Sequence, residues 1–135
     1  MNDLYRQELM EIYKNPGHKG SITSPSVSVT KKNPMCGDTL NLDLLVEYNK
    51  NNNQHIIQNA KFNGESCAVS IISAEMLIED IIGNSIDQVK KIDKKYLLDL
   101  IDMNLTTSRV KCAELILIAL QDAIKKFEDD QKSFD

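Results

Sequence analysis

Apolar residues recur with a helical period near the start of the chain and then alternate as they do in strands. In residues 2–14 they fall close to one helical stripe, which predicts an amphipathic first helix. The breaker cluster Asn15-Pro16-Gly17 should end this helix. A polar loop follows, and the alternation in Val27-Ser28-Val29-Thr30 then predicts a half-buried first strand.

The middle of the chain has the pattern of a β-hairpin. Residues 40–48 are apolar and tolerate strand geometry, and residues 55–62 alternate before the turn signal Asn63-Gly64. The polar run at 49–53 lies between these two segments. We therefore expect two further strands that pair antiparallel around a turn at 49–53.

The second half of the chain has a helical pattern. Residues 68–82 are dense in apolar positions and end at Gly83-Asn84, which predicts a well-buried helix. Two short helices are expected at 86–89 and 95–101, and residues 106–108 offer N-caps to a long helix reaching about Phe127. A run of strands followed by a run of helices predicts an α+β fold, in which a small antiparallel three-stranded sheet packs against several helices. One domain over residues 1–135 is expected, without internal repeats.

Composition narrows the function classes. Hydrophobic residues make up 41% of the chain and charged residues 27%, as in ordinary globular proteins. A net charge of -4 and only 5% aromatic residues argue against nucleic acid as a partner. The longest apolar stretch, Leu115–Leu120, is far shorter than the roughly 20 residues of a membrane span, and it is expected to be a buried helix segment. No secretory signal is evident in the first residues, so a cytoplasmic location is expected.

The three cysteines are the candidate chemistry of the chain. Cys36, Cys67 and Cys112 are an odd number, so they cannot all be paired in disulfides within the chain. With Asp38 they offer three thiolates and a carboxylate, a set that suits zinc or an iron-sulfur cluster. The plainer alternative is three small buried apolar side chains, which free cysteines often are.

Two of these cysteines are expected near the starts of helices. Cys67 should occupy the first turn of the helix at 68–82, and Cys112 should lie near the start of the final helix. Free amide donors and a partial positive charge at a helix N-terminus stabilise a thiolate and lower its pKa. Both thiols are therefore predicted to be activated. The two histidines, His18 and His55, are expected to be exposed structural residues rather than ligands.

Short segments around the cysteines and after the first helix carry a family resemblance when they are taken together. In chain order they are Tyr13-Lys14-Asn15-Pro16, Asn33-Pro34-Met35-Cys36-Gly37-Asp38, Ala60-Lys61-Phe62-Asn63-Gly64-Glu65-Ser66-Cys67-Ala68-Val69-Ser70, Ser73-Ala74-Glu75-Met76-Leu77, Ile82-Gly83-Asn84-Ser85 and Arg109-Val110-Lys111-Cys112-Ala113-Glu114-Leu115. With these segments the chain resembles the IscU/SufU/NifU N-terminal family of iron-sulfur cluster assembly proteins over nearly its whole length. The resemblance implies a SufE/NifU-like fold.

The resemblance also implies a site and partners. Cys36, Asp38, Cys67 and Cys112 would bind Zn²⁺ or a [2Fe-2S] cluster, with Cys112 as the persulfide acceptor. Sulfur would come from a pyridoxal-phosphate-dependent cysteine desulfurase, and apo iron-sulfur proteins would receive the product. Members of the family act as scaffolds that assemble the cluster or as relays that pass the sulfur on.

Two features of the sequence favour different branches of the family. Lys111 stands before the third cysteine, as in the SufU branch, where the scaffold branch usually has histidine, and this favours zinc. The interval from Cys67 to Cys112 lacks the usual SufU insertion and is close to the scaffold length. Lys111 would stabilise the Cys112 thiolate or be a solvated surface residue, and Arg109 would contact the desulfurase or cap a loop. The alternatives to cluster assembly are a zinc-dependent sulfurtransferase without a scaffold role and a purely structural zinc protein.

Overall fold

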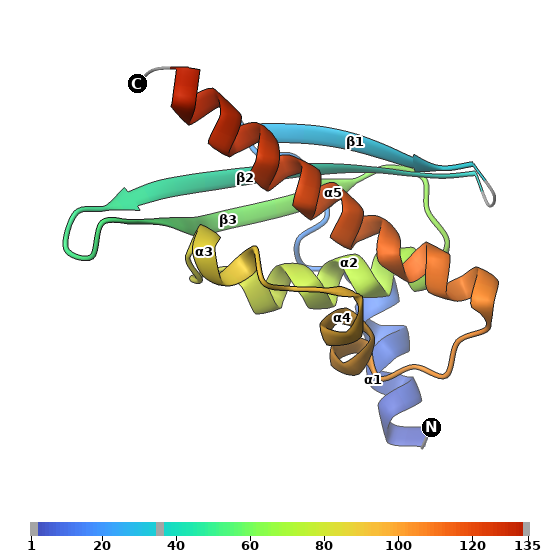
Figure 1. Ribbon diagram of the computed structural model, residues 1–135. Coiled ribbons are helices and arrows are strands. Elements are labelled where there is room, and N and C mark those ends of the chain that lie inside the picture. The colour runs from blue at the N-terminus through green and yellow to red at the C-terminus, as the bar shows by residue number, and fades with distance from the viewer. Residues whose placement is uncertain (1–2, 35–36, 134–135) are drawn as a thin grey trace.

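A three-stranded antiparallel sheet forms one layer of the protein (Figure 1). The computed structural model describes residues 3–34 and 37–133, with no side-chain description at 133. Its strands are β1 (Val27–Asn33), β2 (Asp38–Asn49) and β3 (Gln54–Asn63), in the order β1-β2-β3. The predicted hairpin is confirmed as β2 and β3, and the first strand is longer than the four residues predicted.

The register of the sheet fixes which face is buried. Leu42 pairs with Val29 on one side and with Phe62 on the other. Since side chains alternate along a strand, Leu40, Leu42 and Leu44 all point to the same face, where each is fully buried. The core therefore lies between this face of the sheet and the helices that cover it.

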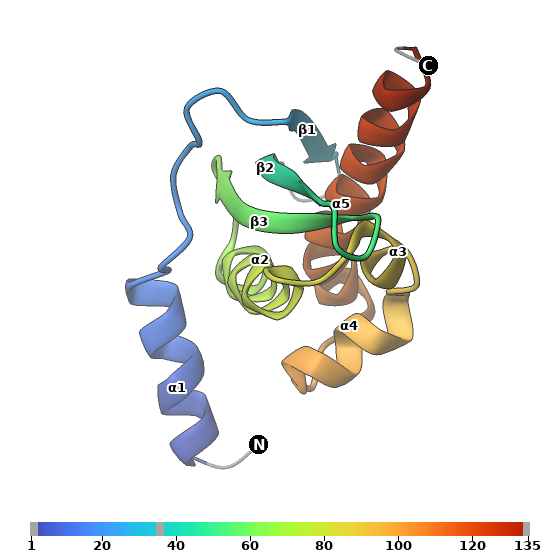
Figure 2. The same ribbon diagram turned by 90° about the vertical axis from the view of Figure 1, so that its left-hand side faces the viewer.

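Within residues 3–34 and 37–133, five helices complete the fold. They are α1 (Asp3–Lys14), α2 (Ala68–Ile81), α3 (Ile86–Val89), α4 (Lys94–Ile101) and α5 (Thr107–Ser133). Helices α2 and α5 pack together and cover the sheet, and α5 crosses it diagonally in Figure 1. Helix α1 packs against α2 and stands away from the sheet in Figure 2. The α+β architecture expected from the sequence is confirmed.

The last helix differs from the prediction. It was expected to end near Phe127, but α5 continues to Ser133. Glu128, within this extension, forms an ion pair with Lys90 at 2.9 Å, which ties the acidic segment to the body of the protein. The apolar run at 115–120 is buried as expected, except that Ile118 is 43% exposed.

The segment after α1 lies along the outer edge of β3. The Phe62 amide donates to the His18 carbonyl at 3.0 Å, and the Gly20 amide donates to the Phe62 carbonyl at 2.8 Å. These bonds cover part of the sheet edge and fix the backbone at His18. In Figure 2 this segment rises from the end of α1 toward β1.

Candidate metal centre

Three of the four predicted ligands come together where β2, α2 and α5 begin. Asp38 is the first residue of β2, Cys67 immediately precedes α2, and Cys112 lies near the start of α5. Their ligand atoms, one carboxylate oxygen and two sulfurs, all lie within 4.8 Å of one another. Cys36 lies outside the described residues. The tertiary fold thus assembles donors that are far apart in the sequence.

The Asp38 carboxylate is held in place by α2. One oxygen accepts a hydrogen bond from the Cys67 amide at 3.0 Å, and the other accepts one from the Ser70 hydroxyl at 2.6 Å. Asp38 is only 5% exposed. A buried carboxylate is costly unless its oxygens are hydrogen-bonded, and here each oxygen has a donor. These bonds set the direction in which the carboxylate faces the two sulfurs.

Ser70 links all three described ligands. Its hydroxyl lies 2.6 Å from Asp38 Oδ2, 3.0 Å from the Cys112 carbonyl oxygen and 3.6 Å from Cys67 Sγ. The side chain is 1% exposed, so water does not compete for these contacts. Sequence analysis did not assign Ser70 to the site. Its signal was a small hydroxyl among the apolar positions of a helix predicted to be well buried, where a polar side chain needs a partner.

A close approach of two backbones brings Cys67 against Asp38. The Thr39 amide donates to the Glu65 carbonyl at 2.8 Å, and Ser66 donates to the Thr39 carbonyl at 3.0 Å. Gly64 has a positive φ of 125°, and a Cβ there would lie 2.2 Å from the Thr39 carbonyl oxygen. Only glycine fits this position. The Asn63-Gly64 turn signal is therefore part of the site's construction.

The two described cysteines differ in their access to solvent. Cys67 is the N-cap of α2, one position before the first turn where it was expected, and it is half-buried. Its side chain makes no capping hydrogen bond, so the thiol is not engaged with the amides that begin α2. Cys112 lies near the start of α5, as predicted, and is 3% exposed. Activation of both thiols by the helix N-termini stays a prediction.

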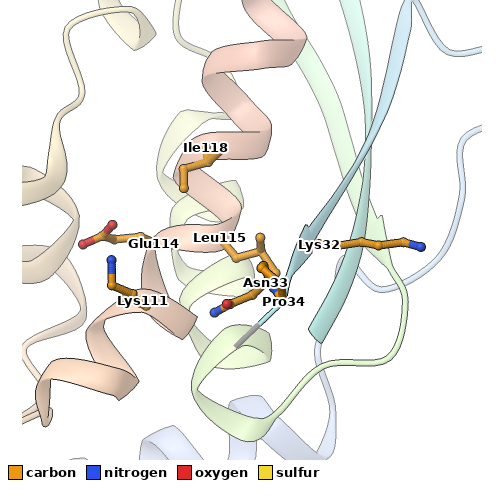
Figure 3. A pocket seen from close by; sticks show the side chains of 7 residues that line it. All are labelled: Lys32, Asn33, Pro34, Lys111, Glu114, Leu115 and Ile118. Carbon is orange, nitrogen blue, oxygen red and sulfur yellow. The ribbon is translucent and has the colours of Figure 1, made fainter. Parts of the chain in front are cut away.

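Lys111 and Arg109 are exposed on the first turns of α5. Lys111 lines a cavity of about 270 Å³, together with Lys32, Asn33, Pro34, Glu114, Leu115 and Ile118 (Figure 3). In this view Lys111 and Glu114 extend to the same side of α5, and Glu114 also forms an ion pair with Lys94 at 3.0 Å. The cavity lies beside the turn that carries Cys112. The roles expected for Lys111 and Arg109 remain predictions.

The expectation that both histidines are exposed is wrong. His18 Nδ1 lies 2.5 Å from Glu75 Oε2, and the side chain of His18 is 25% exposed. The His55 ring packs between the rings of Tyr48 and Phe127, at centroid distances of 5.1 and 5.2 Å. Local sequence placed His18 in a glycine-flanked loop and His55 at the start of a strand, but contacts with other parts of the chain leave both only partly exposed.

The donor set fits zinc. Tetrahedral zinc, with Zn–S near 2.3 Å and Zn–O near 2.1 Å, spaces its ligand atoms by roughly 3.5 Å. Donor atoms already within 4.8 Å of one another need only small side-chain movements to reach that spacing. Two thiols and a carboxylate are also a set that soft or borderline metals prefer over calcium or magnesium. An α+β fold that brings two thiols and an oriented carboxylate to one point has the donors that a thiol-rich zinc site needs.

A family model identifies which proteins of this kind the chain is related to. Residues 4–133 match the NifU-like N terminal domain. The chain therefore belongs to the family of proteins with this domain, and the resemblance found in its cysteine segments is confirmed.

Curated relatives carry two kinds of name. The chain is 32% identical to the zinc-dependent sulfurtransferase SufU of Bacillus subtilis, over 95% of this chain and 94% of the relative. It is 27% identical to the iron-sulfur cluster assembly scaffold protein IscU of Escherichia coli K12, over 96% of this chain and 94% of the relative. Both branches that the sequence features favoured are thus among its relatives.

Solved structures share the fold. A putative iron-sulfur cluster assembly scaffold protein for the SUF system, from Fervidobacterium islandicum AW-1, superposes with a TM-score of 0.65 at 24% identity, covering 86% of this chain and 93% of that one. A NifU-like N-terminal protein from Brucella abortus gives a TM-score of 0.70 at 16% identity, over 94% and 96%. Within residues 3–34 and 37–133, none of the helices has the length and apolar character needed to cross a membrane.

Proposed function

We propose that this protein takes part in iron-sulfur cluster assembly by accepting sulfur from a cysteine desulfurase at the centre formed by Asp38, Cys67 and Cys112, with Cys36 as the fourth ligand. The observation that carries the proposal is the convergence of two thiols and a carboxylate within 4.8 Å. Membership of the NifU-like family and relatives named for sulfur transfer and cluster assembly support it.

The sulfur-accepting step is a thiol exchange. The Cys112 thiolate attacks the outer sulfur of a persulfide on the desulfurase, forms a new S–S bond, and releases the desulfurase cysteine as a thiolate. Electrons balance without an added oxidant or reductant. Because Cys112 is 3% exposed, the centre has to open before this attack, and displacement of one ligand by a residue of the desulfurase would do so.

Zinc held by these residues would keep the thiols deprotonated and unavailable to oxidants until the partner docks. Asp38 has the one oxygen ligand of the set, and its two hydrogen bonds to α2 hold it in a fixed orientation. Cys67, which is half-buried, lies at the more open side of the centre. Lys111, on the same turn as Cys112, would place a positive charge near the persulfide anion.

The fate of the sulfur separates two candidate functions. A relay passes the sulfur on, and Lys111 and the SufU relative favour this. A scaffold builds a [2Fe-2S] cluster as cargo for apo iron-sulfur proteins, and the short interval between Cys67 and Cys112 and the IscU relatives favour this.

The test combines metal analysis with sulfur transfer. Protein purified without oxygen is assayed for zinc, iron and acid-labile sulfide, and is then incubated with a cysteine desulfurase and ³⁵S-cysteine. The proposal expects label on the wild-type protein and none on Cys112→Ser. Zinc without sulfide and strong stimulation of the desulfurase would identify the relay, whereas iron and sulfide in equal amounts would identify the scaffold.

The contrary outcome is equally definite. If no cysteine of the wild-type protein acquires ³⁵S while zinc is bound, the centre is a structural zinc site and the proposal fails. Ser73→Ala is a suitable control variant, because Ser73 is on α2 and donates to the Ala113 carbonyl at 2.7 Å without contacting the described ligands.

A further inference from the structure

A second group of metal-ligating side chains lies where the segment after α1 meets α2. His18, Glu75 and Glu79 bring a ring nitrogen and two carboxylate oxygens within 4.8 Å of one another. The two glutamates are one helical turn apart on α2, beyond the turns that carry Cys67 and Ser70. None of the three takes part in the contacts of the cysteine centre described above.

Glu75 is oriented as a ligand would be. One carboxylate oxygen accepts the His18 amide at 2.7 Å, and the other lies 2.5 Å from His18 Nδ1. Glu75 is 3% exposed, and the His18 carbonyl is bonded to the Phe62 amide at 3.0 Å. A helix fixes Glu75 and a sheet edge fixes the backbone of His18, so the pair is held between two rigid elements. A cation bound here would replace the contact between Glu75 Oε2 and His18 Nδ1, and these two atoms would move apart to hold it, while the His18 amide keeps the other oxygen in place.

Glu79 supplies a second carboxylate that the protein itself does not use. It is exposed, and among residues 3–34 and 37–133 it has no hydrogen bond or ion pair. Glu75 and Glu79, four residues apart on one helix, repel each other as like charges. A divalent cation between the two carboxylates would offset this repulsion.

We propose that His18, Glu75 and Glu79 form a second divalent-cation site, separate from the cysteine centre, with His18 Nδ1 and one oxygen of each glutamate as protein ligands. Imidazole with carboxylates suits borderline ions of the zinc and ferrous class rather than the soft ions that thiolates favour. Three protein ligands and the exposure of Glu79 leave the remaining coordination positions to water. On binding, the ring proton resides on Nε2, since Nδ1 has to offer its lone pair.

The test uses Zn²⁺ on the full chain whose cysteine centre already holds one equivalent. Ring nitrogens are followed by long-range ¹H–¹⁵N correlation, and the chain has only two histidines. A second equivalent should shift the His18 ring nitrogens and leave those of His55 unchanged. Glu79→Gln should weaken binding of this second equivalent at least tenfold, and it should fold normally because Glu79 is exposed and unpartnered.

Matched variants make the outcome decisive. Glu47→Gln, at an exposed position of β2, should bind the second equivalent as the wild type does. Cys112→Ser should lose the first equivalent and keep the His18 response, which separates this proposal from the proposed function. Saturation at one equivalent, a response at His55 instead, equal affinity in Glu79→Gln, or an equal His18 shift with Mg²⁺ would each overturn it.

Discussion

Two buried carboxylates lie at helix α2, Asp38 from β2 and Glu75 from α2 itself. They are hydrogen-bonded in similar ways but have different neighbours. Asp38 is bonded to a backbone amide at Cys67 and to the Ser70 hydroxyl, and Glu75 is bonded to a backbone amide at His18 and to its imidazole. In both cases each oxygen has a hydrogen-bond partner, and the residue is 5% exposed or less. In both regions, therefore, a backbone amide and a side chain fix the orientation of a buried carboxylate.

The difference between the two regions lies in the neighbouring donors. Around Asp38 the fold places sulfurs, and around Glu75 it places an imidazole and a second carboxylate. Sulfur donors select soft metals and can also carry sulfane sulfur, whereas nitrogen and oxygen donors do neither. The two carboxylates are thus oriented alike, and the neighbouring donor atoms decide which metal and which chemistry each region favours.

The largest expected effect comes from removing a sulfur ligand. Cys112→Ser should abolish binding of the first zinc equivalent, because an alcohol is a poor replacement for a thiolate ligand. At free zinc about a thousand times its Kd, zinc should raise the free energy of unfolding of the wild type by about 4 kcal/mol. Chemical denaturation with and without a chelator measures this difference. A stabilisation of equal size in Cys112→Ser would show that the metal lies elsewhere.

The next largest effect is expected from removing the Ser70 hydroxyl. Ser70→Ala removes the hydroxyl from Asp38 Oδ2 and should weaken zinc affinity by about 10- to 100-fold, as loss of a ligand's orienting partner does. It should also cost about 1–3 kcal/mol of stability, because two buried acceptors lose a hydrogen-bond donor. Chelator competition measures the affinity, and urea denaturation measures the stability.

Ser73→Ala is the matched control for Ser70. Both serines lie on α2 and contact backbone carbonyls of α5, but Ser73 does not contact Asp38. It should lose a similar amount of stability and keep zinc affinity unchanged. If both variants weaken zinc binding equally, Ser70 acts only through helix packing.

A smaller effect is expected from changing the second buried carboxylate, Glu75. Glu75→Gln keeps the shape of the side chain but replaces charge-assisted hydrogen bonds with neutral ones, and it should cost about 1–2 kcal/mol of unfolding free energy without added metal. Glu79→Gln should change it by less than about 0.5 kcal/mol, as surface substitutions usually do. Urea denaturation of the two variants compares them. Equal losses would mean that burial of Glu75 is not what stabilises this region.

The smallest effect concerns a third buried carboxylate, Asp43, which lies near no cysteine or histidine in the described contacts. Burial alone would raise its pKa, but hydrogen bonds from Ser28, the Ile22 amide and Asn41 outweigh it, so the pKa is lowered. A lowered pKa gives stability that is present above the unfolded-state value and is lost as the pH falls through the folded-state value.

Ser28→Ala should therefore raise the Asp43 pKa and move the onset of acid destabilisation to higher pH. The loss at neutral pH should be about 1 kcal/mol, because one hydrogen bond to a charged acceptor is removed. Unfolding free energies between pH 7 and pH 3 measure this. A profile parallel to that of the wild type would mean that the other two donors alone set the pKa.

The sequence by itself predicted most of the elements and singled out the cysteines as candidate ligands. The apolar, strand-tolerant segment at 40–48, the alternation at 55–62 and the turn between them predicted the β2–β3 hairpin, because these signals are local. The short segments around Cys67 and Cys112 carried the family resemblance. The end of α5 was predicted too early, and Glu128, just past the predicted end, forms an exposed ion pair with Lys90, which is distant in the chain.

Only the tertiary structure decided which polar residues meet. Ser70 looked like one small residue in a buried helix, and its contacts with Asp38 and Cys112 depend on how β2 and α5 dock against α2. Sequence alone assigned His18, in a glycine-flanked loop, to the surface. Backbone bonding to the edge of β3 instead places its ring against Glu75. Contacts between residues far apart in the chain follow from packing and register, which no local pattern encodes.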